Sequence, residues 1–196
     1  MSASRLGMVC SGVASLVAAT VATLPALPAQ AGTCPASTTC PTTVNFTVDS
    51  PDGLTITVPN GPVNIGGGAP GGTISGQLGS VQVADERAIL TATWVATVVA
   101  ATGGFTTGGG TAAETIPNTD VLYWSGPATA TTGTGTFVPG QANAGAAQSL
   151  DIARTAFSKT TGSGMNSATW NPTIEVNVPA SAVGGTYTGT VNHSVA

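Results

Sequence analysis

Charged side chains are the scarcest feature of this 196-residue chain. Asp, Glu, Lys and Arg make up 6% of it, with four cations, eight carboxylates and one histidine, and the formal net charge is −4. Nucleic acids and anionic membrane surfaces attract proteins through clustered Lys and Arg, so these few dispersed cations exclude nucleic acid and argue against a membrane surface as partner. Acid–base catalysis also has little to draw on, and we expect neither an enzyme nor a cofactor.

Long apolar runs are lacking everywhere except near the first residue. Residues 1–5 are short and positively charged, residues 7–27 are apolar and uncharged, and residues 29–31 (AQA) offer the small side chains that signal peptidase needs. This pattern predicts a signal peptide over residues 1–31. The protein is then expected to be secreted and extracellular, associated with the cell surface, and without stable membrane insertion after cleavage.

A retained membrane anchor is the alternative for the same segment. Residues 6–24 approach the length of roughly 20 apolar residues that a spanning helix needs. Pro25 and Pro28 interrupt that run, however, and no positive stop-transfer flank follows it. The sequence therefore favours cleavage.

Cysteine is rare as well, with three in the chain. Cys10 falls in the predicted signal, which leaves Cys34 and Cys40 as a closely spaced pair. A disulfide is the favoured interpretation, because thiols pair and persist in oxidising compartments. A metal site is the alternative, but it would lack two of its four ligands. We expect a disulfide-bearing segment at residues 32–43, ahead of one domain at 44–196.

What the chain has in quantity is Thr, Gly, Ala and Val in alternating apolar and polar order. Such a period of two predicts strands with one buried and one exposed face, and regular turns between them are typical of a sandwich or barrel. We therefore predict an all-β fold, an Ig-like antiparallel β-sandwich. Residues 142–154 are the best candidate for a helix, although 149–157 fits a strand equally well. The predicted strands are residues 44–48, 54–58, 72–83, 88–100, 121–124, 130–137, 149–157, 166–178 and 186–195.

Aromatic residues are the remaining candidates for recognition. Most are spaced about one per strand and are expected to anchor the core. Tyr123 and Trp124 are adjacent, so their side chains point to opposite faces of a strand and at least one leaves the principal core. An exposed tryptophan is a common platform for a sugar ring, and this pair is therefore a candidate binding face.

The few reactive side chains suggest weaker alternatives. His193 could serve a Ser-His-Asp triad, but no nucleophile motif accompanies it. Two carboxylates suffice for a glycosidase, and Asp85 with Glu86 is one close pair, here interpreted as solvated charge beside Arg87. Lys159 could form an isopeptide crosslink, but it precedes residues that look like a turn.

Several motifs resemble the WxL-type surface domains of Gram-positive bacteria. They are residues 83–87 (VADER), 93–97 (TWVAT), 121–126 (VLYWSG), 174–179 (IEVNVP) and 182–191 (AVGGTYTGTV). The resemblance covers about residues 75–195 and implies an exported β-sandwich that attaches non-covalently to the cell wall, with peptidoglycan as partner. The family takes its name from a Trp-x-Leu motif that occurs twice. This chain departs from that motif, since it has Trp94-Val-Ala at the first place and His193-Ser-Val at the second.

Two hypotheses follow from the sequence. In the first, the chain binds a cell-wall polymer through an aromatic face at Trp94, Tyr123 and Trp124. In the second, it is a structural or adhesive subunit of a surface layer or fibre, and its strand edges pair with surface proteins or with further copies of itself.

Overall fold

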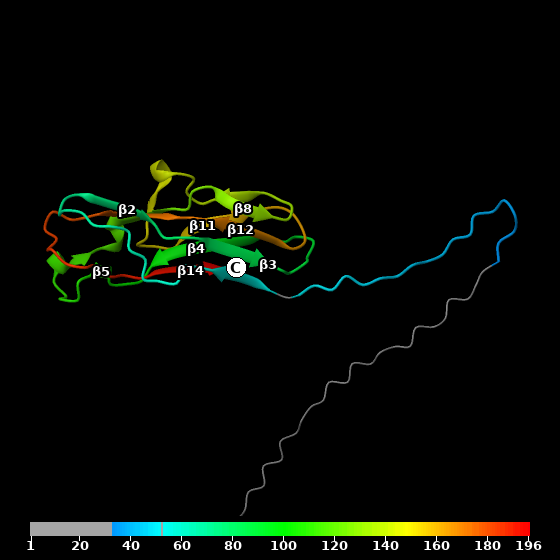
Figure 1. The fold of residues 1–196 in the computed structure, drawn as a ribbon, viewed down its shortest axis with the longest axis horizontal. Helices are drawn as coiled ribbons and strands as arrows, with labels where there is room; N and C mark the ends of the chain where they lie inside the picture. The colour runs from blue at the N-terminus through cyan, green and yellow to red at the C-terminus, as the bar shows by residue number, and fades with distance from the viewer. Residues whose placement is uncertain (1–32, 52) are drawn as a thin grey trace, which may run out of the picture. The chain divides into compact units, whose positions relative to one another are not determined.

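A computed structural model describes residues 33–51 and 53–196 (Figure 1). The predicted signal peptide and Asp52 lie outside these residues. The chain divides into a unit that ends at Phe46 and a compact unit, Thr47–Ala196. The predicted disulfide between Cys34 and Cys40 is present in the first unit, with the two Cα atoms 5.8 Å apart. None of the helices in the described residues is long and apolar enough to span a membrane.

The compact unit consists of antiparallel strands joined by turns and three short 3₁₀ helices. The helices are η1 (Ala112–Glu114), η2 (Asn118–Asp120) and η3 (Ala144–Ala146). In chain order the strands are β1 (Leu54–Thr57), β2 (Thr73–Gln77), β3 (Val81–Asp85), β4 (Trp94–Ala100), β5 (Phe105–Thr106), β6 (Thr115–Ile116), β7 (Val121–Trp124), β8 (Ala128–Thr132), β9 (Phe137–Pro139), β10 (Gln148–Ser149), β11 (Arg154–Lys159), β12 (Asn166–Trp170), β13 (Thr173–Asn177) and β14 (Val191–Val195).

The strands form three four-stranded sheets and one two-stranded sheet. Their orders are β1-β3-β12-β8, β10-β7-β13-β2 and β14-β4-β11-β9, with β5-β6 as the small sheet. Every pair is antiparallel, and the sheets pack together as in a sandwich. The all-β prediction is confirmed. The finer Ig-like arrangement stays a prediction.

Alternation in the sequence explains which side chains enter the core. Along β4 the residues Trp94, Ala96, Val98 and Ala100 are buried, while those between them are exposed or half-buried. β12 and β13 follow the same rule. The apolar face of each strand thus packs against the others, which removes apolar surface from water.

Aromatic side chains join the sheets inside the core. The rings of Phe157 and Trp170 stack with their centroids 4.9 Å apart. The indole Nε1 of Trp170 donates a hydrogen bond of 3.1 Å to the hydroxyl of Tyr123. This bond satisfies a buried donor that would otherwise destabilise the core.

Most predicted strands are confirmed with different bounds. The strand predicted at residues 121–124 has those bounds, and four of the others each divide into two strands, as 166–178 does around Asn171 and Pro172. In residues 142–154 only η3 is helical. The strand predicted at 44–48 is wrong: this segment pairs with no described strand, and Val44, Phe46 and Val48 expose 76, 84 and 76% of their surface.

Candidate functional site

The three aromatic candidates differ in their access to solvent. Trp94 and Tyr123 are core residues, with 2 and 0% of their surface exposed. Trp124 is half-buried, so the expectation that Tyr123 and Trp124 face opposite sides of β7 is confirmed. Because a buried ring cannot lie against a polymer, the predicted aromatic face is reduced to Trp124.

Trp94 belongs to a buried polar network instead. Its indole Nε1 donates to Asn166 Oδ1 at 2.8 Å, and Asn166 Nδ2 donates to Asp85 Oδ2 at 3.2 Å. Arg87 binds the same carboxylate through both oxygens, with Nε–Oδ1 and Nη2–Oδ2 distances of 2.8 and 3.0 Å. These bonds join β3, β4 and β12 at one end of the domain.

The network changes the interpretation of the acidic pair. Asp85 is buried, and hydrogen bonds from Arg87 hold the pKa of its carboxyl below its usual range. Glu86 is exposed on the opposite side. The prediction that Asp85 is a solvated charge is wrong, because Arg87 and Asn166 replace its water.

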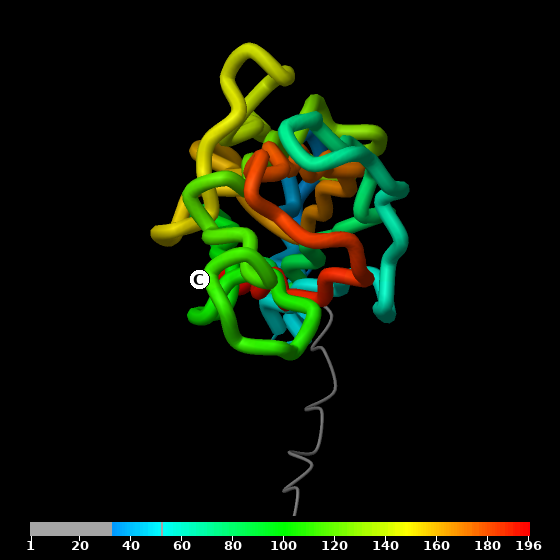
Figure 2. The backbone as a smooth tube through the Cα atoms, turned by 90° about the vertical axis from the view of Figure 1, so that its left-hand side faces the viewer, coloured from blue at the N-terminus to red at the C-terminus, as the bar shows by residue number. Residues whose placement is uncertain are grey.

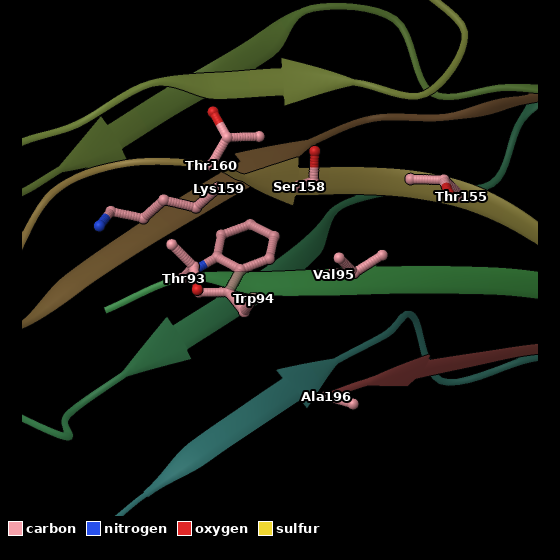
Figure 3. Close-up of a pocket in the computed structure, with 8 residues that line it drawn as sticks. All are labelled: Thr93, Trp94, Val95, Thr155, Ser158, Lys159, Thr160 and Ala196. Atoms are coloured by element: carbon pink, nitrogen blue, oxygen red, sulfur yellow. The ribbon is translucent and has the colours of Figure 1, made fainter. Parts of the chain in front are cut away.

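Lys159 is also part of the interior. It is the last residue of β11 and pairs in register with Trp94, and Figure 3 shows the two side chains close to each other beside an open hollow of about 570 Å³. Its Nζ donates to the Ala92 carbonyl oxygen at 2.7 Å, and burial lowers the pKa of the ammonium group. Among the described residues no hydrogen bond links Nζ to Asn166 or Asp85.

A larger groove of about 810 Å³ opens at the other end of the domain. Its inner wall is apolar and comes from Ile74 of β2 and from Ile174 and Val176 of β13, with Val191 and His193 of β14 beside them. The loops that surround it, residues 58–70, 103–116 and 180–190, face the viewer in Figure 2. Among the residues that the structure describes, no Asp, Glu, Lys or Arg lines this groove.

Residues 58–70 run along the groove as a strap rather than as a strand. Ile65 packs so closely on β2 that a Cβ at Gly76 would lie 2.8 Å from the Ile65 Cα, a distance that real side chains do not tolerate. Apart from the turn at Ala69–Gly72, no backbone hydrogen bond joins the strap to the strands of the described domain. β2 ends its sheet, so its outer edge is free of strand pairing within this part of the chain.

His193 is one of the polar residues that line the groove. Its ring meets Tyr123 edge-on, with the centroids 5.9 Å apart, and its buried Nε2 has no hydrogen-bond partner among the described residues. Burial lowers the pKa of this imidazole to about 4. The histidine is therefore neutral at pH 7 and acts as a packing residue beside the tyrosine.

The groove was not predicted from the sequence. Its walls come from residues 58 to 193, and the glycine-rich run at 65–72 indicated only a turn. No single run of the sequence indicates it, because its walls lie far apart along the chain.

Comparison of the chain with protein-family models, with curated proteins and with solved structures finds no match. The resemblance to WxL-type surface domains therefore rests on the motifs in the sequence.

Proposed function

We propose that this chain is an exported, non-catalytic cell-surface protein that acts as a structural or adhesive subunit. The observation that carries this proposal is the exposed row of Val44, Phe46 and Val48, whose alternation is that of a strand. Apolar side chains that remain exposed in a row mark an interaction site in a soluble protein. The disulfide at Cys34 and Cys40 agrees with an oxidising, extracellular setting.

The charged side chains support a non-catalytic role. All three cations beyond residue 32 are held by structural contacts: Arg87 by Asp85, Arg154 by Asp151 and the Ser149 carbonyl, and Lys159 by the Ala92 carbonyl. A catalytic group needs a free reactive atom directed at a substrate. The hydrogen bonds of these three side chains instead go to other residues of the fold and stabilise it.

The second candidate function is non-covalent association with the cell wall through peptidoglycan. Trp124 favours it, because this half-buried indole lies on the face of β7 opposite the core residue Tyr123 and could stack on a sugar ring. The motif resemblance to wall-binding domains supports the same role. Trp94 and Tyr123 do not contribute, since both are buried.

Sedimentation with washed cell-wall sacculi, together with sizing chromatography over a concentration series, separates the two functions. A subunit is expected to form larger species as its concentration rises and to leave sacculi without bound protein. Wall binding that is lost in Trp124→Ala and kept in Leu122→Ala, whose half-buried side chain lies on the same face of β7, would assign the binding to the indole and favour the second function. A single monomeric species at every concentration would refute the first.

A further inference from the structure

We infer that residues 44–48 of one copy occupy the groove of a second copy, as an added strand along the free edge of β2. The inference rests on the proposed subunit function and names the two surfaces that join. It identifies the partner as another molecule of this chain.

The donor segment has the properties of an unpaired strand. Val44, Phe46 and Val48 lie at every second position, with Asn45 and Thr47 between them, so an extended backbone places the three apolar side chains on one face. All three are exposed. Residues 33–48 contain no charged side chain, so burying this segment leaves no charge without water.

The acceptor has matching properties. The groove wall is mostly apolar and has no charged side chain among the described residues. The neighbouring edge of β2 offers backbone donors and acceptors that no described strand uses. The strap at residues 58–70 covers part of the groove without forming a ladder with β2. A strand added at this edge would gain backbone hydrogen bonds and place its apolar face in the groove.

The direction of the chain favours a partner copy over the same copy. Leu54, where β1 begins, pairs with Asp85 at one end of the sheet, and β1 then runs to Thr57. The groove starts beyond that point, at Val58. The chain therefore enters β1 at the end of that strand away from the groove. A contact between two different surfaces adds copies head to tail and produces a fibre when it does not close.

Two variants test the inference on the full mature chain. Phe46→Asp places a charge in the donor row, and Val183→Asp places one on a groove residue that is 43% exposed, so neither opens the core. Each is expected to weaken self-association by about 100-fold or more, since a central apolar anchor carries much of an interface. Leu90→Asp is the matched control: Leu90 is 88% exposed and belongs to neither surface, so this variant is expected to assemble like the wild type.

Mixing the two variants gives the decisive result. The Phe46→Asp variant has an unaltered groove, and the Val183→Asp variant has an unaltered donor segment. In an equimolar mixture the donor segment of the second variant is therefore expected to bind the groove of the first, which gives a dimer that grows no further. Light scattering measures the mass. If wild-type chains assemble and Phe46→Asp assembles equally well, the inference is wrong and the proposed subunit function stands. If the wild type stays monomeric, both are wrong. If circular dichroism shows that Val183→Asp is unfolded, the test depends on Phe46→Asp alone, because the Phe46 side chain is exposed and its replacement leaves the core intact.

Discussion

His193 makes the stability of the domain depend on pH in a defined window. The imidazole lies in the groove wall against Tyr123, and its buried Nε2 has no acceptor among the described residues. Protonation would place a cation there without compensation, which is why burial lowers the pKa to about 4 from an ordinary 6.5. The unfolded chain thus takes up a proton at a higher pH than the folded chain.

The size of the effect follows from the two pKa values. Above about pH 6.5 the histidine is neutral in both states and the stability is complete; below that pH the unfolded state alone binds the proton, and stability falls until the pH reaches about 4. Between pH 7 and pH 5 the loss amounts to at most about 2 kcal/mol, because the open groove lets water screen part of the charge. For a domain of this size that corresponds to a decrease in Tm of about 4 to 8 °C.

Thermal unfolding followed by circular dichroism at pH 7, 6 and 5 measures this decrease. The control is His193→Phe, which keeps an aromatic ring beside Tyr123 and has no proton to bind, so its Tm is expected to change little over the same range. Side-chain carboxyls ordinarily titrate near pH 4, below the lowest pH of this series. An equal decrease in the wild type and in His193→Phe would refute the assignment to this histidine.

Three further variants test the polar interior and the disulfide. Asp85→Ala leaves Asn166 and Arg87 without their acceptor and is expected to lower the free energy of unfolding by about 3 kcal/mol, at the low end for a broken buried pair because Arg87 reaches solvent. In urea denaturation Glu86→Ala is its exposed control, and similar losses in both would contradict the network. Tyr123→Phe removes the acceptor of the Trp170 indole and is expected to cost about 1 to 3 kcal/mol in the same assay; an unchanged midpoint would count against that hydrogen bond. Replacing both Cys34 and Cys40 by Ser is expected to change the stability of Thr47–Ala196 by less than about 0.5 kcal/mol, since the disulfide belongs to the other unit; a large decrease in Tm would contradict this.

The fold was predictable where side-chain alternation alone decides the structure. β7 has the predicted bounds because its alternate residues, Val121 and Tyr123, are buried against the core. The predicted strand at 166–178 breaks because Pro172 lacks a backbone donor, and its carbonyl instead accepts from the Leu78 backbone of the chain beside β2. The alternation at residues 44–48 is equally regular, but no strand forms there among the described residues. Alternation determines which side chains share a face, and it does not provide the neighbouring strand that a sheet needs.

The polar interior could not be read from the sequence in the same way. Asp85 and Lys159 carry charges and look like surface residues, and their burial depends on partners far along the chain, such as Asn166 and the Ala92 carbonyl. The groove has the same origin, since its walls meet only when β2 and β14 approach in space. The sequence identified Trp94, Tyr123 and Trp124 as candidates by residue type alone, and of these three only Trp124 reaches solvent once the strands pack.

Hydrogen–deuterium exchange of residues 44–48 in concentrated mature protein tests the central claim most directly. In an assembled sample the backbone amides of this segment are expected to exchange slowly, because they pair with β2 of a neighbouring copy, and dilution to the monomer is expected to restore fast exchange. Fast exchange at 44–48 in a sample that light scattering shows to be oligomeric would contradict the account.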